Sequence, residues 1–447
     1  MVATTNPFLL GNYAPVRDEV TDSRLEVRGA LPRELSGRYL RIGPNPYAMP
    51  EGPYHWFIGD GMVHGIELRD GRANWYRNRW VRTAPITGAT GEAAIDGPPP
   101  PMYDSSNTNV IGHAGRVLSL TEGAMPYELS PELDTLRRTA FDGTLPTGFT
   151  AHPKTDPVTG ELHGFAYSWT SPNLIYHVID ASGRLVRSEP ITVGGPTMIH
   201  DFALTRSSVV FFDLPVVFDL SMVERGLAMP YRWDDDYPAR VGVMPRDGGD
   251  ADVVWSDVEP CYVFHPMNAY DEGDAVVVDV CRHPTMFAHS VEGPNDGGLP
   301  TLDRWTIDTA ARKVRQERLD DRGQEFPRVN ESLLMSRHRY GYVVETINSE
   351  TAFDTARILK HDLQTGTSEG HDFANGGSPG EFVFVPSEGA TSEDDGYLMG
   401  FVYDPTRDSS DFVVLDASAV ASEPIATVAL PQRVPYGFHG NWVPDPR

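Results

Sequence analysis

Cysteine is almost absent from this sequence, because 447 residues include only Cys261 and Cys281. This scarcity excludes the dense disulfide framework that stabilises many small secreted domains. The two cysteines flank a predicted hairpin, so a bridge between them is geometrically conceivable. We expect two buried free thiols instead, as is usual in a reducing compartment.

Basic residues are also scarce, with 37 Lys and Arg against 63 Asp and Glu, which gives a formal net charge of −26. Such a charge repels phosphate backbones and anionic lipid headgroups. The composition therefore argues against nucleic-acid binding and against a polybasic membrane anchor. We interpret the acidity as a means of keeping the protein soluble.

Long hydrophobic runs are missing too, since no stretch approaches the ~18 apolar residues of a membrane span. Residues 1–20 also lack the basic region and apolar run of a secretory signal. We expect a soluble, cytoplasmic protein with at most weak membrane-surface contact. Residues 83–104 are too polar to act as an anchor, and residues 216–233 are the one apolar candidate, which could equally be a core strand and helix.

The sequence does contain many short apolar segments separated by turn residues, and it has 42 Gly and 38 Pro. Few segments show the apolar period of a helix, so the pattern predicts an all-β protein with closely spaced strands. A sandwich, a barrel and a propeller all fit this pattern. The segments we predict as strands include 161–169, 174–180, 184–193, 275–282, 304–308, 313–319, 340–347, 357–363, 397–404, 411–417 and 424–430.

Four of the 14 histidines stand apart from the rest, because each follows an apolar or β-branched residue at a probable strand. They are His152 in FTAHPKTDPVTGE, His200 in TMIHDFAL, His265 in YVFHPMNAYDEGD and His439 in YGFHGNWV. Imidazole is a ligand suited to iron, copper, nickel or zinc, and four neutral imidazoles leave the charge of a divalent ion uncompensated. A site of this kind favours binding of oxygen or of a polarisable substrate.

Segments along nearly the whole chain resemble the carotenoid cleavage oxygenase family, which includes carotenoid, apocarotenoid, stilbene and phenylpropene cleavers and a retinoid isomerase. The resemblance begins at LPRELSGRYLRIGPNP, continues through HWFIGDGMVHGIELRDGRANWYRNRWVR and ends at FHGNW. A short piece such as GDGM is weak evidence alone. The same segments in this order are specific.

The resemblance implies an iron centre on a propeller. It implies a seven-bladed β-propeller with one iron(II) ion per chain on the central axis, and with loops and short helices capping the top face. The four histidines above match the iron ligands of the family, and open positions remain for the cosubstrate O2. Three glutamates that match those orienting ligand histidines are Glu122, Glu325 and Glu381, which leaves His152 without a glutamate.

The spacing of the residues chosen by this resemblance fits a propeller. His152, His200, His265, Glu325, Glu381 and His439 follow one another at intervals of 48, 65, 60, 56 and 58 residues. Each interval is about one four-stranded blade, so residues near the start of successive innermost strands would converge on the axis. Without a Gly/Ser linker or a composition shift to divide the chain, we predict a single domain over residues 1–447.

The implied reaction is oxidative cleavage of a conjugated carbon–carbon double bond into two carbonyl products, by iron(II) and O2, with no side chain required as acid or base. Stilbene cleavers carry a lysine before the first orienting glutamate, where this chain has Thr121, so we favour a carotenoid or apocarotenoid over a stilbene. A small phenylpropene is the further alternative. Candidate substrate-binding residues are Phe57, Thr121, Tyr103 and Trp169.

Two other classes of protein fit an all-β chain of this length. A propeller hydrolase or lactonase would use calcium or zinc, and its metal ligands normally include carboxylates. A non-enzymatic binding propeller would need no metal. The group of four histidines argues against both alternatives.

Overall fold

The structure, a computed structural model, describes residues 6–101, 103–227, 229–289, 297–347 and 354–446. The chain groups into two compact units. Unit 1 comprises Met1–Ala140, Thr355–Lys360 and Glu369–Arg447, and unit 2 comprises Phe141–Asp354 and His361–Ser368. The single domain over residues 1–447 stays a prediction.

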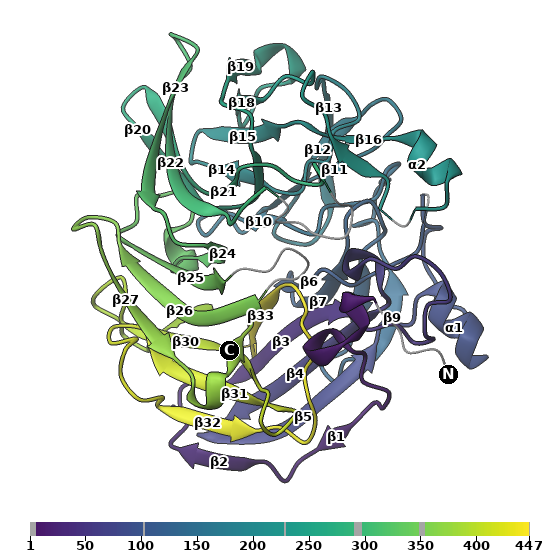
Figure 1. Ribbon diagram of the computed structural model, residues 1–447, viewed down its shortest axis with the longest axis vertical. Coiled ribbons are helices and arrows are strands. Elements are labelled where there is room, and N and C mark those ends of the chain that lie inside the picture. The colour runs from purple at the N-terminus through teal and green to yellow at the C-terminus, as the bar shows by residue number, and fades with distance from the viewer. Residues whose placement is uncertain (1–5, 102, 228, 290–296, 348–353, 447) are drawn as a thin grey trace. The chain divides into compact units, whose positions relative to one another are not determined.

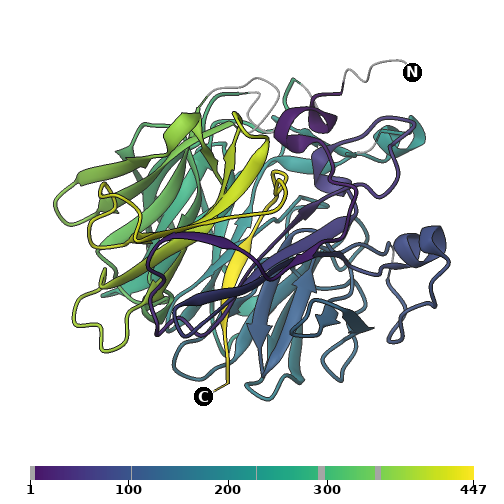
Figure 2. The same ribbon diagram turned by 90° about the horizontal axis from the view of Figure 1, so that it is seen from below.

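In the part of unit 1 that the structure describes, three antiparallel sheets lie entirely within the unit. The first has the order β1 (Thr21–Asp22), β5 (Arg72–Trp80), β4 (Gly61–Arg69), β3 (Gly37–Pro44) and β33 (Gly440–Pro444). The second has β6 (Asn109–His113), β7 (Arg116–Leu120), β8 (Tyr127–Leu129) and β9 (Thr135–Arg138). The third has β2 (Glu26–Gly29), β32 (Ala426–Ala429), β31 (Ser409–Asp416), β30 (Gly396–Asp404) and β28 (Ser378–Pro379), and β29 (Val383–Pro386) also pairs with β30. Figure 2 shows the yellow C-terminal strand β33 beside strands of the N-terminal segment, where it pairs with β3.

Among the described residues, three four-stranded sheets and one two-stranded sheet lie entirely in unit 2 (Figure 1). The first four-stranded sheet has the order β10 (Lys154–Thr155), β11 (Leu162–Tyr167), β12 (Leu174–Ile179) and β13 (Leu185–Ile191). The second has the order β14 (Phe202–Leu204), β15 (Ser208–Asp213), β18 (Arg240–Pro245) and β19 (Val254–Asp257). The third has the order β20 (Tyr262–Glu272), β21 (Ala275–His283), β22 (Thr301–Asp308) and β23 (Lys313–Asp320). The two-stranded sheet pairs β16 (Val216–Phe218) with β17 (Tyr231–Trp233).

One more sheet has the order β24 (Gln324–Arg328), β25 (Tyr340–Ile347), β26 (Asp354–Asp362) and β27 (Thr367–Asp372). Among the described residues, seven sheets therefore have four or more strands, which is the number of blades that was predicted. The all-β, seven-bladed propeller fold is confirmed. The helices are short: α1 (Ala84–Thr90), α2 (Leu220–Glu224), and the 3₁₀ turns η1 (Pro7–Leu9), η2 (Gly11–Tyr13), η3 (Trp56–Ile58), η4 (Asp250–Asp252), η5 (Glu331–Leu333) and η6 (Ala374–Gly376).

Burial along one sheet shows why these segments form strands of different kinds. All six residues of β12, LIYHVI, are buried, as expected for a strand covered on both faces. Residues of β13 alternate between partly buried and exposed up to its last position, so one face of that strand meets solvent. All eleven segments predicted as strands from apolar runs and turn residues form strands, whose ends lie within three residues of the predicted ones.

Each unit has its own hydrophobic core. In unit 1 one cluster gathers Tyr39, Tyr76 and Phe412 with neighbouring aliphatic side chains. In unit 2 a cluster centres on Phe165 and Phe202, whose rings meet edge to face at 5.2 Å. Both cysteines of unit 2 are buried as free thiols.

Within the described part of the chain, no helix has the length and apolar character needed to cross a membrane. The apolar segment 216–233 forms β16, α2 and β17. In α2, Leu220 and Val223 are exposed, at 52% and 45% of their surface. The segment is thus a two-stranded hairpin whose strands flank a short helix, with Val216 and Met222 buried.

We expect acid to destabilise the protein between pH 6.5 and about 4, because several buried histidines must stay neutral in the folded state. Burial lowers the pKa of His177 to about 4, whereas the unfolded chain takes up a proton near the ordinary value of 6.5. The unfolded state therefore binds more protons in this window, so the free energy of unfolding rises with pH and is lost on acidification. Burial also lowers the pKa of His55, His64, His163, His338 and His361.

Urea unfolding at pH 7 and pH 5 measures this effect. The linkage predicts a loss of up to about 2 kcal/mol per fully shifted histidine over that interval. A His177→Gln variant should lose less stability than the natural protein over the same step. Equal urea midpoints at the two pH values would contradict the prediction.

Candidate metal centre

In unit 2, the residues predicted to bind or orient the metal lie at the beginning of successive sheets. His152 comes two residues before β10, and His200 comes two residues before β14. His265 lies in β20, and Glu325 is the second residue of β24. Each of these elements is the first strand of its sheet, so the interval of 48 to 65 residues corresponds to one sheet.

His152, His200 and His265 form a tight cluster. A ligand nitrogen from each ring lies within 4.8 Å of the others. The Nε2 atoms of His200 and His265 are 3.3 Å apart, and the His152 ring centre is 4.3 Å from that of His200. His152 and His265 are buried, and His200 is half-buried. Three imidazoles therefore point their nitrogens at a common point.

Glu325 fixes the orientation of His265. The His265 Nδ1–H donates to Glu325 Oε2 at 2.6 Å, so Nε2 of the neutral ring carries the lone pair and faces the cluster. The carboxylate is fully buried and also accepts the Phe326 backbone N–H at 2.6 Å and His283 Nε2–H at 2.9 Å. Burial opposes ionisation of Glu325, but the two histidine rings outweigh it and hold the pKa of this carboxyl below its ordinary value.

A second carboxylate of unit 2, Asp201, lies beside His152. Its Oδ2 is 3.9 Å from His152 Nδ1 and accepts a hydrogen bond from Lys154 Nζ at 2.8 Å. Asp201 is buried, whereas the side chain of Lys154 is 21% exposed. Burial raises the pKa of Asp201, and the Lys154 cation opposes this rise. His152 was expected to lack a glutamate, and the carboxylate near it is an aspartate.

We expect the Lys154→Met substitution to destabilise the protein by about 3 kcal/mol, because it leaves the Asp201 carboxylate buried without its cation. Urea unfolding measures the change. Adding Asp201→Asn to this variant should restore part of the loss. Lys313→Met, on the exposed strand β23, serves as the control and should change stability by less than about 0.5 kcal/mol. Equal effects of the two lysine substitutions would refute this role of Lys154.

In unit 1, His439 is held in a similar way by Glu381. His439 Nδ1–H donates to Glu381 Oε1 at 3.0 Å, and the Gly440 backbone N–H donates to Oε2 at 2.8 Å. Both side chains are buried. A Cβ atom at Gly440 would lie 2.7 Å from the Leu40 carbonyl oxygen, so the close approach of β33 to β3 requires glycine there.

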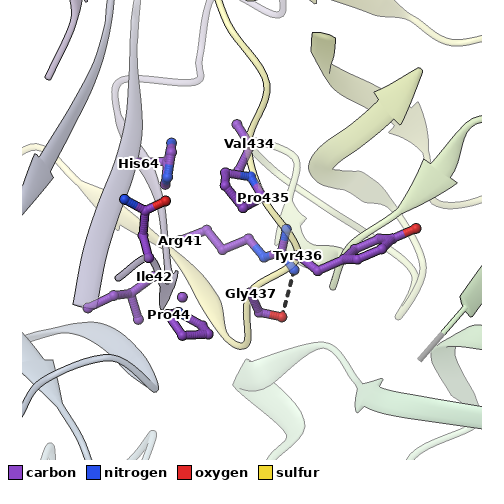
Figure 3. A pocket seen from close by; sticks show the side chains of 10 residues that line it. Arg41, Ile42, Pro44, His64, Val434, Pro435, Tyr436 and Gly437 are labelled. Carbon is purple, nitrogen blue, oxygen red and sulfur yellow. Dashed lines mark hydrogen bonds between the residues drawn. The ribbon is translucent and has the colours of Figure 1, made fainter. Parts of the chain in front are cut away.

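Arg41 holds the backbone immediately before His439. Its guanidinium donates to the carbonyl oxygen of Gly437 at 2.8 Å (Figure 3) and to that of Phe438 at 3.2 Å. Arg41 is only 4% exposed and borders a cavity of about 10 Å³, roughly the space of one water molecule. Burial lowers the pKa of Arg41, and the nearby Glu381 carboxylate opposes this shift.

The residues proposed for substrate binding occupy different surroundings. In unit 1, the Thr121 hydroxyl is buried and bonds to Asn107 Oδ1 at 2.7 Å and Thr108 Oγ1 at 2.8 Å. The Tyr103 hydroxyl donates to the Glu122 backbone oxygen, and Tyr103 is 45% exposed.

The other two candidates are aromatic. Phe57 of unit 1 is half-buried, and its ring meets Phe438 edge to face at 5.7 Å. In unit 2, Trp169 is 42% exposed and stacks on Phe218 at 5.4 Å. The roles of all four residues in substrate binding, and of Glu122 as an orienting glutamate, stay predictions.

The imidazole nitrogens of the unit 2 cluster are suitable ligands for iron(II). Neutral imidazoles are good ligands for this ion, and an imidazole whose other nitrogen donates to a carboxylate is fixed in the tautomer that a metal requires. His265 meets this condition through Glu325, with its Nε2 only 3.3 Å from that of His200. The His200 Nε2–H can donate to His265 Nε2 over this distance, and with the His200 proton on Nδ1 instead both nitrogens offer a lone pair to one cation. The residues present therefore fit the metal.

Sequence reasoning missed three polar side chains around this cluster: Lys154, Asp201 and His283. Two of them carried a signal, since Asp201 directly follows His200 and Lys154 lies two residues after His152. His283 carried no comparable sequence signal. It reaches Glu325 only because β21 folds against β20, where His283 lies opposite Tyr262.

Comparison with known proteins identifies relatives over almost the whole chain. The family described as retinal pigment epithelial membrane protein matches residues 13–444. A carotenoid cleavage oxygenase of Mycobacterium tuberculosis is 45% identical, over 98% of each chain. The carotenoid 9,10(9',10')-cleavage dioxygenase 1 of Arabidopsis thaliana is 35% identical, over 98% of this chain and 90% of the plant protein.

Solved structures agree with these relatives. The crystal structure of Pseudomonas brassicacearum lignostilbene dioxygenase has a TM-score of 0.89 at 29% identity and covers 99% of each chain. Cobalt-substituted Synechocystis ACO has a TM-score of 0.85 at 28% identity and covers 96% of this chain and 97% of that one. The fold, the histidine cluster and these relatives lead to one conclusion: the chain belongs to the carotenoid cleavage oxygenase family and is an iron(II)-dependent, alkene-cleaving dioxygenase.

Proposed function

We propose that this protein cleaves a conjugated carbon–carbon double bond of a carotenoid or apocarotenoid, using O2, into two carbonyl products. One alkene and one O2 give two carbonyl groups, so the atoms balance without another reactant. The cluster of His152, His200 and His265, with its nitrogens within 4.8 Å of one another, is the observation on which the proposal rests.

We further propose that His152, His200 and His265 bind one iron(II) ion per chain on the propeller axis, with His439 as the fourth ligand. Support for His439 comes from the likeness of its surroundings to those of His265. Each ring donates Nδ1–H to a buried glutamate, which leaves Nε2 unprotonated for a metal. Iron(II), when bound, supplies the redox chemistry that lets O2 react with an alkene.

The protein's own side chains orient the proposed metal ligands and shield them from water. Glu325 and Glu381 keep two rings in the required tautomer, and the buried positions of His152, His265 and His439 keep water from their edges. The reaction needs no proton transfer from a side chain, because the balanced cleavage moves no proton. We therefore assign no acid or base.

The substrate class follows from the named relatives and from Thr121. The Mycobacterium tuberculosis and Arabidopsis thaliana relatives are named for carotenoid cleavage. The structure of lignostilbene dioxygenase supports a stilbene as second candidate. Thr121, which stands where stilbene cleavers carry a lysine, offers no cation to a phenolic hydroxyl and is already bonded to Asn107 and Thr108. A carotenoid or apocarotenoid is favoured for this reason.

The proposed partners are thus a small, apolar, conjugated substrate and O2. A cytoplasmic location, an absence of nucleic-acid binding and at most weak contact with a membrane surface stay predictions from the sequence.

Turnover of a substrate panel tests the proposal. Iron(II)-loaded protein is incubated in air with carotenoids, apocarotenals, 4-hydroxystilbenes and phenylpropenes, and products are identified by mass. Paired carbonyl products from a carotenoid or apocarotenal are expected. Products only from hydroxystilbenes or phenylpropenes would refute the substrate class and leave the reaction type standing.

A further inference from the structure

His283 contacts Glu325, the glutamate that orients His265, and the proposed reaction assigns no role to His283. Its Nε2–H donates to Glu325 Oε1 at 2.9 Å, while His265 and the Phe326 amide both bond to the other oxygen, Oε2. All of these residues belong to unit 2, and the side chains of His283 and Glu325 are completely buried. His283 is therefore the one hydrogen-bond donor to Oε1 among the described residues.

The surroundings of His283 select one tautomer. Among the described residues its Nδ1 has no hydrogen-bond partner. A proton there would be a buried donor without an acceptor, which costs about 1–3 kcal/mol. The neutral ring with its proton on Nε2 is the form that avoids this cost and still donates to Glu325.

The ring of His283 is also held in place. Phe264 meets it edge to face at 5.2 Å and an angle of 85°. The same Phe264 ring meets His200 at 4.7 Å and 84°. A single aromatic side chain thus packs against both His283 and a proposed iron ligand.

The corresponding glutamate of unit 1 has its second oxygen held differently. Glu381 gives Oε1 to His439, and its Oε2 accepts the Gly440 backbone N–H at 2.8 Å. Glu325 has a backbone donor too, but that donor shares Oε2 with His265. Without His283, Oε1 would have no donor and the carboxylate could rotate about its last side-chain bond.

We propose that His283 is a positioning residue of the metal centre: it fixes the Glu325 carboxylate and, through it, the tautomer and direction of His265. The inference rests on the proposed function, because it takes His265 as a metal ligand. Outer hydrogen-bond partners of metal ligands commonly change metal affinity by 10- to 100-fold. His283 acts one hydrogen bond further out, because it bonds to Glu325, which in turn bonds to His265.

Cobalt(II) binding to the metal-free protein tests this role without relying on turnover. Absorbance titration gives the Kd, and the visible bands of bound cobalt report the geometry of its ligands. His283→Leu removes the donor, His283→Gln keeps an amide N–H at the Nε2 position, and His283→Asn places its amide near the Nδ1 position. His177→Leu is the matched control, a buried histidine of unit 2 that bonds to Ser188 instead.

We expect the Kd for cobalt to rise by about 10-fold or more in His283→Leu and His283→Asn, with altered visible bands. His283→Gln should stay within about threefold of the natural protein, because a single hydrogen bond of normal length is retained. His177→Leu should lower stability and leave the Kd unchanged. If His283→Leu does not fold, the comparison of the Gln and Asn variants decides.

Two outcomes would overturn the inference. In the first, the Gln and Asn variants have the same Kd. In the second, His177→Leu raises the Kd as much as His283→Leu, so that loss of stability alone explains the effect. His265→Ala separates this inference from the function on which it rests: if that variant also binds cobalt normally, His265 is not a ligand and the proposed centre itself fails.

Discussion

Replacement of His265 by alanine is expected to abolish alkene cleavage and to release most of the bound iron. His265 Nε2 is the nitrogen that faces His200 at 3.3 Å, and its Nδ1 is committed to Glu325. A bound metal contributes several kcal/mol to a transition state, so its loss lowers kcat/KM by on the order of 10³-fold or more. The substitution also leaves the buried Glu325 carboxylate without its closest ring donor.

Iron content by elemental analysis and kcat/KM on the best substrate of the panel measure the effect. His177→Ala is the matched control, since His177 is a fully buried histidine of the same unit that lies outside the cluster. That control should lose stability and keep its iron and its activity. Retention of one iron per chain by His265→Ala would show that this histidine is not a ligand.

The second large effect is expected for Glu325→Gln, which should weaken metal binding by about 10- to 100-fold. Glu325 accepts hydrogen bonds from His265 on one oxygen and from His283 on the other. A glutamine has one carbonyl oxygen and one amide N–H₂, so one of the two rings would face a donor instead of an acceptor. The ring that faces the amide N–H₂, His265 or His283, then either changes its tautomer or loses its hydrogen bond.

Metal titration of the purified variant, followed by turnover at saturating iron, separates affinity from chemistry. We expect saturating iron to restore a large part of the activity of Glu325→Gln, whereas His265→Ala should not recover. Glu331→Gln is the control, because Glu331 is an exposed glutamate of the same unit that pairs with Arg328. An affinity of Glu325→Gln equal to that of this control would rule out the orienting role.

The fold was largely predictable because each blade repeats a local pattern. Apolar runs bounded by turns, such as residues 174–180, identify strands without knowledge of the tertiary structure, and β12 spans Leu174–Ile179. The number of blades needed more than local pattern, since apolar runs alone also fit a sandwich or a barrel. It came from the family resemblance and from the intervals between the histidines and glutamates.

The candidate site was predictable only where residues stand in recognisable segments. His265 and Glu325 were found in this way, although 60 residues separate them. Lys154, Asp201 and His283 were not found, because their roles depend on distances across sheets: 2.8 Å between Lys154 and Asp201, and 2.9 Å between His283 and Glu325. Lys154 and Asp201 lie close in sequence to two of the histidines, but a lysine or histidine in a strand does not identify its carboxylate partner until the strands are placed.

The most direct test of the account is oxygen-dependent cleavage by iron(II)-loaded protein on an apocarotenal, run in parallel under air and under argon. The account predicts two carbonyl products whose masses add up to the substrate plus one O2, formed in air, absent under argon and absent from His265→Ala. Failure to cleave any conjugated alkene by a folded protein with one iron per chain would contradict it.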